Sequence, residues 1–66
     1  MASTFKTSSG SIYTFDARNK IITGGVFGNN AVQYIPERTQ IFQNAPAIIQ
    51  LSNGQVVRTS KVRSIV

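Results

Sequence analysis

The dipeptide Asn53-Gly54 places the strongest constraint on the fold, because it separates two apolar segments at the spacing of a hairpin. Asn and Gly tolerate the positive φ angles that tight hairpin turns require. We therefore expect a strand over residues 47–51, a turn over 52–54 and a second strand over 55–59. The alternation of apolar and polar residues continues through residues 60–66, which predicts more strand there.

Two further turn signals predict hairpins in the first third of the chain. Ser and Gly over residues 8–11 separate candidate strands over 4–7 and 12–15. Asp16 is suited to open a type I turn, and Asn19 to adopt a left-handed conformation, before a strand over 20–23. Residues 24–30 contain three glycines and two asparagines, which predicts a loop.

The middle of the chain leaves one assignment open. Residues 32–35 predict a short strand that Pro36 ends. Residues 36–43 fit either one helical turn that begins at Pro36 or a strand through residues 39–42. Five to six short strands at this spacing predict an all-β fold, a small antiparallel barrel or sandwich of SH3-like or related type, in a single domain over residues 1–66.

The stabilising devices open to this chain are few, because its 66 residues include no cysteine and no histidine. A domain of this size buries only about 60% of the surface that its unfolded chain exposes. Disulfides and thiolate metal sites are excluded, and two acids, Asp16 and Glu37, are too few for a cage around a hard metal ion. We therefore expect no metal and no cofactor, and we expect a homo-oligomer.

Apolar patterning argues against a membrane protein. No apolar run approaches the roughly 20 residues that span a bilayer. Residues 1–6 lack the basic segment followed by an apolar one that is typical of a secretory signal. We therefore expect a soluble protein in the cytoplasm. Phe5, Phe15 and Phe42 are expected in the core, because so small a domain must bury most of its large apolar side chains.

The residue types present predict that the protein is not an enzyme and has no catalytic residues. A hydroxyl nucleophile needs a base, and the commonest one, histidine, is absent. Ser60 and Lys61 are adjacent and would point to opposite sides of a strand. The Gly-x-x-x-Gly spacing of Gly24 and Gly28 lacks the lysine of a nucleotide-binding loop. A mobile loop with Phe27 at its tip, available for stacking or docking, is the alternative.

Basic residues give the clearest functional signal. Seven Lys and Arg against two acids give a net charge of +5, and no acid follows Glu37. Arg58, Lys61 and Arg63 lie within six residues. On a regular strand, Lys61 and Arg63 would share one face and Arg58 the other, whereas a β-bulge would bring the three together. Such a surface would attract phosphate or an acidic protein.

Three kinds of binding are consistent with these residues. A nucleic acid would contact the basic residues and stack on Tyr13, Phe27 or Tyr34. A protein partner would use Tyr34, Phe27 and Arg38 as anchors. A nucleotide or other phosphate ligand would bind between the chains of an oligomer. The candidate binding residues are Arg18, Lys20, Phe27, Tyr34, Arg38, Arg58, Lys61 and Arg63.

The two ends of the chain carry a resemblance. Residues 7–13 read Thr-x-Ser-Gly-Ser-x-Tyr, between two predicted strands, and residues 59–62 read Thr-Ser-x-Val. These segments resemble a group of short bacteriophage and bacterial proteins, over residues 1–16 and 55–66 only. In that group a proline often stands where this chain has Lys61. The resemblance implies a phage-encoded protein that binds and inhibits or modulates a host protein or defence system in the host cytoplasm, and it transfers no functional residue.

The hydroxyl groups of these two segments have two alternative roles. Ser and Thr at strand ends hydrogen-bond to backbone groups in turns. They would also bind a ligand phosphate if the first turn and the last strand lay together.

Overall fold

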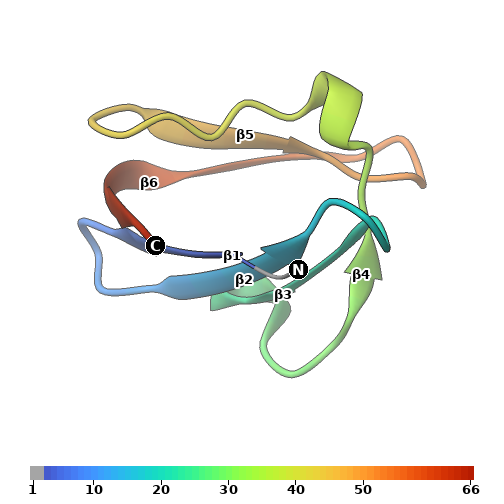
Figure 1. Ribbon diagram of the computed structural model, residues 1–66, viewed down its shortest axis with the longest axis horizontal. Helices are drawn as coiled ribbons and strands as arrows, with labels where there is room; N and C mark the ends of the chain where they lie inside the picture. Colours follow the sequence, from blue (N-terminus) through green and yellow to red (C-terminus); the bar gives the residue numbers. More distant parts are fainter. Residues whose placement is uncertain (1–2) are drawn as a thin grey trace.

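The computed structural model describes residues 3–66 as strands joined by short turns (Figure 1). Residues 1 and 2 lie outside the described residues, so the structure describes only residues 3–6 of the segment that lacks the pattern of a secretory signal. The strands are β1 (Ser3–Thr7), β2 (Ile12–Asp16), β3 (Ile21–Gly24), β4 (Val32–Gln33), β5 (Pro46–Gln50) and β6 (Val56–Ile65). Two 3-10 turns, η1 (Gly25–Phe27) and η2 (Pro36–Arg38), complete the elements. Within residues 3–66, no helix is long and apolar enough to cross a membrane.

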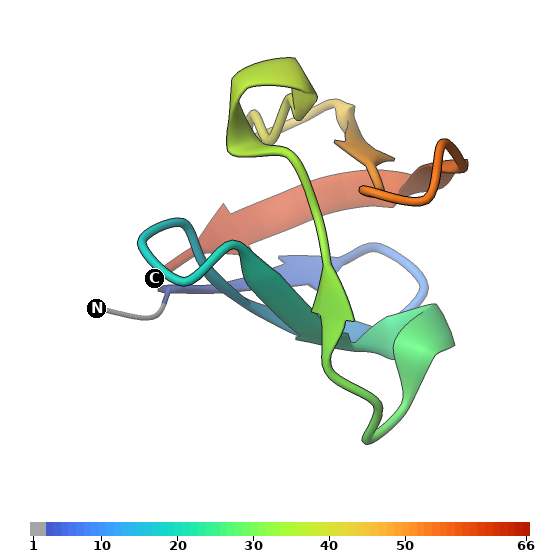
Figure 2. The same cartoon turned by 90° about the vertical axis from the view of Figure 1, so that its right-hand side faces the viewer.

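The six strands form one antiparallel sheet in the order β4-β3-β2-β1-β6-β5, curled into a half-barrel. Figure 1 shows β5 and the first part of β6 in one layer, and β1, β2 and β3 in the other. In Figure 2, the segment that begins with β4 rises from one layer to the other and leads into η2. The predicted all-β fold of small antiparallel strands is confirmed, as are the three predicted hairpins.

Strand β6 joins the two layers. Its first half pairs with β5, where Arg58 lies opposite Ile48, and its second half pairs with β1, where Ser64 lies opposite Lys6. The register shifts once on each side, which marks two β-bulges. Bulges bend a strand and increase its twist, so β6 can leave one layer and enter the other without a break.

The two edges of the sheet meet each other. Tyr34, just after β4, forms an isolated antiparallel bridge with Leu51, just after β5. A second bridge, between Gln40 and Ile48, covers the edge of β5 that does not pair with β6. Pairing of this kind satisfies edge groups that would otherwise attract other strands. Both alternatives for residues 36–43 are therefore partly right, since a 3-10 turn over Pro36–Arg38 precedes a single strand-like bridge.

Aromatic residues fill the centre of the half-barrel. Phe5 is fully buried and stacks on Tyr13, with ring centroids 4.9 Å apart and planes 12° apart. Phe15 is partly buried against this pair, 5.8 Å from Phe5. The core prediction is wrong for Phe42, whose side chain is 63% exposed. Ile41 turns inward to the core in this extended segment, and its neighbour Phe42 points outward as a result.

The turn between β2 and β3 forms as predicted around Asp16. Its Oδ1 accepts the backbone N–H of Arg18 at 3.0 Å and that of Asn19 at 3.2 Å. The left-handed residue is Lys20, with φ 58°, and the prediction of Asn19 for this role is wrong. Asn19 is held instead by donating its side-chain amide to Asp16 Oδ2 at 2.8 Å. These bonds, led by the backbone N–H of Asn19, lower the pKa of Asp16, which stays ionised at neutral pH.

Two glycines with nearly equal φ angles allow a sharp test of the packing between β2 and β3. Gly24 has φ 92° and its missing Cβ would strike the backbone carbonyl oxygen of Ile12, whereas Gly54 has φ 95° and open space around it. Gly54→Ala is expected to cost about 1–2 kcal/mol from the left-handed conformation alone. Gly24→Ala is expected to cost clearly more, because strand pairing must shift. Urea unfolding of both variants measures the difference, and equal losses would contradict the packing of Gly24.

Candidate functional site

All seven basic side chains are exposed, and four of them lie on the adjacent strands β1 and β6. Neither of these strands contains an acidic residue. We call the outward surface of these strands the basic face, and it consists of Lys6, Arg58, Lys61 and Arg63. The acids Asp16 and Glu37 lie outside it, at the end of β2 and in η2.

A bulge in the middle of β6 places Arg58 and Lys61 on the same side. From Arg58 to Lys61, β6 advances three residues while β5 advances two. Thr59 and Val62 are buried, and both residues between them are exposed, so the alternation of the strand is reset. Of the two alternatives that the sequence left open, this register matches a bulge rather than a regular strand for Arg58 and Lys61.

A buried hydroxyl stabilises that bulge. Thr59 Oγ1 accepts the backbone N–H of Ala47 at 3.0 Å and donates to the carbonyl of Ser60 at 2.8 Å. The side chain thus occupies the place of a backbone partner that the bulge removes from the ladder. Because Thr59 and Ala47 are both buried, the loss of this hydroxyl would leave an amide without a partner.

A second bulge occurs where β6 meets β1. Ser64 lies opposite Lys6 and Val62 lies opposite Thr7, so Arg63 is the extra residue. Lys6, Arg63 and Ser64 together line a shallow cavity of about 390 Å³. The basic face therefore has a concave part at this bulge.

The first turn packs against the basic face. The backbone N–H of Ser8 donates to the carbonyl of Lys61 at 2.8 Å, so the first turn and the last strand lie together. The hydroxyls of Thr7 and Ser9 form a hydrogen bond of 2.9 Å, and the hydroxyls of Ser9 and Ser11 form a longer one of 3.5 Å. The turn hydroxyls are thus partly used within the turn, while the side chains of Ser8 and Ser9 remain exposed.

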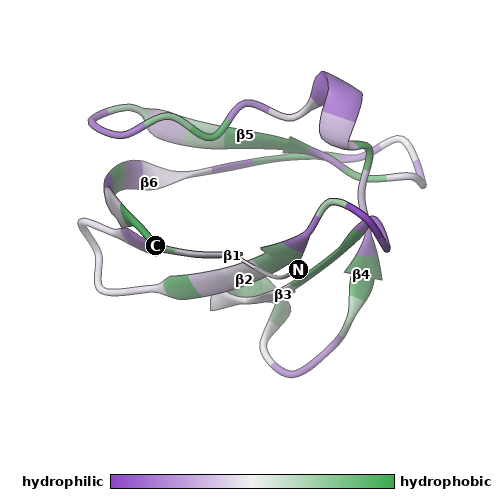
Figure 3. Cartoon of the chain, in the orientation of Figure 1, coloured by the Kyte–Doolittle hydropathy of each residue, from purple (hydrophilic) through white to green (hydrophobic). Residues whose placement is uncertain are grey.

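The other three basic residues lie near the two acids. Arg18 and Lys20 belong to the turn that Asp16 opens, and Arg38 follows Glu37 in η2. Figure 3 shows this turn and η2 as strongly hydrophilic segments. Lys20 and Glu37 line the same cavity of about 260 Å³. All three side chains are exposed, and the two nearby carboxylates offset part of their charge, which sets them apart from the basic face.

The predicted stacking platforms are wrong for both tyrosines. Tyr13 and Tyr34 are only 2% and 3% exposed, because both belong to the core. Tyr13 stacks on Phe5, and its hydroxyl accepts the N–H of Val26 at 3.3 Å. Burial also raises the pKa of Tyr34. Neither ring offers a free face to a base.

The expectation that Phe27 lies at a loop tip is also wrong. Its ring packs edge-on against Tyr13, with centroids 6.1 Å apart and planes 78° apart. The exposed apolar residue of this loop is Val26, which is 71% exposed. The hydrogen bond from Val26 to the Tyr13 hydroxyl turns the 3-10 segment so that Phe27 faces the core.

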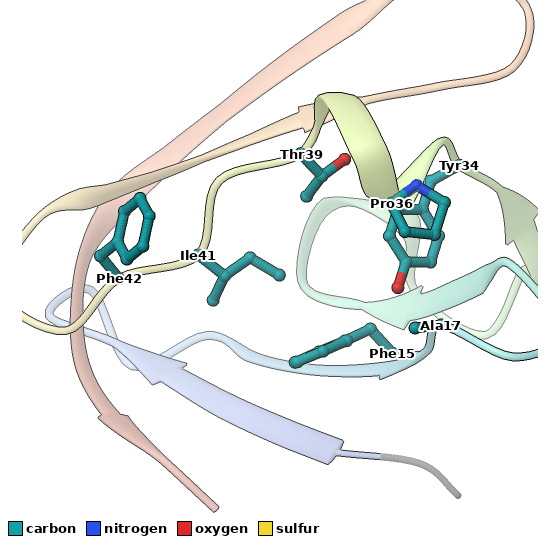
Figure 4. Close-up of a pocket in the computed structure, with 7 residues that line it drawn as sticks. All are labelled: Phe15, Ala17, Tyr34, Pro36, Thr39, Ile41 and Phe42. Atoms are coloured by element: carbon teal, nitrogen blue, oxygen red, sulfur yellow. The ribbon is translucent and has the colours of Figure 1, made fainter.

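An apolar cavity opens at the mouth of the half-barrel (Figure 4). Its volume is about 300 Å³, and its lining residues are Phe15, Ala17, Tyr34, Pro36, Thr39, Ile41 and Phe42. Figure 4 shows Ile41 projecting into it from the segment opposite Phe15. We call this feature the apolar mouth. Sequence reasoning missed it, because the apolar pair Ile41-Phe42 gives no signal of which side chain faces solvent.

Comparisons with protein families, curated proteins and solved structures gave no match to this chain. Within residues 3–66, no group of three or more His, Cys, Asp or Glu is placed to hold a metal ion.

Proposed function

We propose that the protein is a non-catalytic binding protein whose partner is a nucleic acid, held through its phosphates by the basic face. The observation that carries this proposal is the pair of bulges in β6, which leave Arg58, Lys61 and Arg63 exposed along that strand and bring Arg63 next to Lys6 of β1. Lys and Arg side chains neutralise the phosphates whose charge dominates affinity for nucleic acids. The absence of acids from β1 and β6 leaves this attraction unopposed on the face.

Phosphate contacts, rather than base stacking, are expected to supply the affinity. Exposed aromatic rings provide most of the stacking energy in proteins that bind single strands. Here Tyr13 and Tyr34 are in the core, and the basic face contains no aromatic residue. We therefore expect weak sequence preference and strong dependence on salt.

A salt titration tests the proposal. Four phosphate contacts predict that the logarithm of the association constant falls with the logarithm of salt concentration, with a slope of about −3.6 for duplex DNA and about −2.8 for a single strand. Fluorescence anisotropy of a labelled oligonucleotide measures this slope. A lack of binding at low salt, where the electrostatic attraction is strongest, would refute the proposal.

A protein partner is the second candidate, favoured by the apolar mouth. Phe42 is exposed at its rim, and interface anchors are often aromatic side chains beside a pocket. In this alternative the protein is a phage-encoded inhibitor or modulator of a host protein or defence system. The salt titration bears on the choice, because an absence of oligonucleotide binding at low salt would leave the protein partner as the remaining candidate. Self-association stays a prediction in both.

A further inference from the structure

We propose that Lys6, Arg63 and Ser64 form a subsite that binds one phosphate group directly, which makes this bulge the anchor point of the basic face. The inference rests on the proposed function and names the part of the face that grips the partner. The ligand class is a phosphate group of a nucleotide or polynucleotide.

The bulge at Arg63 creates the subsite. On a regular strand Arg63 and Ser64 would point to opposite faces. Here the register passes from Val62 opposite Thr7 to Ser64 opposite Lys6, and both Arg63 and Ser64 are exposed. Directly opposed residues of antiparallel strands have Cβ atoms about 4.5–5.5 Å apart. Three polar side chains therefore border one concavity of about 390 Å³.

The three side chains offer complementary ways to hold a phosphate. The guanidinium of Arg63 can donate two parallel hydrogen bonds to two phosphate oxygens. The ammonium of Lys6 acts as a mobile point charge, and the hydroxyl of Ser64 adds a neutral donor. Ile12 lies opposite Lys6 on the other side of β1 and is 54% exposed.

The backbone at the bulge is held from the side of the apolar mouth. Gln43 Nε2 donates to the carbonyl of Arg63 at 3.1 Å. The N–H of Asn44 donates to the carbonyl of Val62 at 2.8 Å, and the N–H of Val62 donates to the carbonyl of Ala45 at 2.9 Å. A backbone fixed before binding reduces the entropy lost when the ligand is bound. Gln43 thus contributes to holding the backbone at Arg63.

NMR titration of the ¹⁵N-labelled protein with inorganic phosphate tests the subsite. The amide signals of residues 6, 63 and 64 are expected to shift in the wild type and in Arg58→Gln, and not in Arg63→Gln. Arg58 is the matched control, because it is an exposed arginine on the same face and strand but outside the cavity. Lys6→Gln is a second variant on the opposite strand and is expected to behave as Arg63→Gln does.

Oligonucleotide binding separates the subsite from the wider face. Arg63→Gln is expected to weaken binding about tenfold or more, and Arg58→Gln less than Arg63→Gln, because only Arg63 loses a paired hydrogen bond. An oligonucleotide with and without a 5′-phosphate, and a free nucleotide, show whether a terminal or an internal phosphate occupies the subsite.

The outcomes distinguish the subsite from the proposed function. Equal losses in Arg58→Gln and Arg63→Gln, with no phosphate-dependent shifts at residues 6, 63 and 64, would overturn the subsite and leave nucleic-acid binding intact. Phosphate-dependent shifts at these residues without any oligonucleotide binding would support the subsite and overturn the proposed function.

Discussion

Replacing Phe5 with alanine is expected to leave most molecules unfolded at room temperature. Phe5 is fully buried, stacks on Tyr13 and contacts the partly buried Phe15. Truncation of a buried phenylalanine to alanine costs about 3–5 kcal/mol. A single core of this size supplies about 3–5 kcal/mol of net stability, so the change removes nearly all of it. Circular dichroism during urea unfolding measures the loss.

Phe42→Ala is the matched control, since it makes the same change in a side chain that is mostly exposed. Its expected cost is below about 1 kcal/mol, in line with substitutions away from a core. If the two alanine variants lost the same free energy of unfolding, the division between the buried ring of Phe5 and the exposed ring of Phe42 would be wrong.

Neutralising the basic face is expected to abolish most nucleic-acid binding. The variant changes Lys6, Arg58, Lys61 and Arg63 to glutamine, which removes every charged side chain to which the proposal assigns a phosphate contact. At about 50 mM salt we expect the affinity for an oligonucleotide to fall about 100-fold or more, and the salt slope to approach zero. Anisotropy at several salt concentrations measures both quantities.

A second charge variant shows whether binding depends on where the basic residues lie or only on the net charge of the protein. Changing Arg18, Lys20 and Arg38 to glutamine removes three charges outside the basic face. We expect this variant to keep most of its affinity, because carboxylates already offset these residues. All substituted side chains in both variants are exposed, so the free energy of unfolding should change little. A loss as large as that of the first variant would show that net charge alone drives binding.

The hairpins could be predicted from the sequence because their signals are local. Asn53-Gly54, the Ser-Gly turn before β2 and the Asp16 turn each specify a conformation within a few residues. The side chain of Asn53 accepts the N–H of Gln55 at 2.9 Å, within the turn it defines. The sheet class follows from such turns together with short apolar segments between them.

The site was harder to predict, because its geometry depends on partners far away in the sequence. Each bulge of β6 arises from pairing with a different strand, β5 on one side and β1 on the other, and alternation within β6 alone does not fix their positions. The same limit applies to Tyr34, whose burial follows from its bridge to Leu51. The exposure of Phe42 depends likewise on which side of its segment packs against the core.

The basic face is assembled only when β1 and β6 pair during folding. Thr4 and Val66 exchange backbone hydrogen bonds of 3.3 and 2.7 Å, so strands from opposite ends of the sequence lie side by side. Lys6 lies in the first described strand, but the bulge that brings Arg63 beside it requires β6, the last of the described strands. A chain in which β6 has not yet paired with β1 therefore carries the charge of Lys6 without the concave surface that Lys6, Arg63 and Ser64 line together.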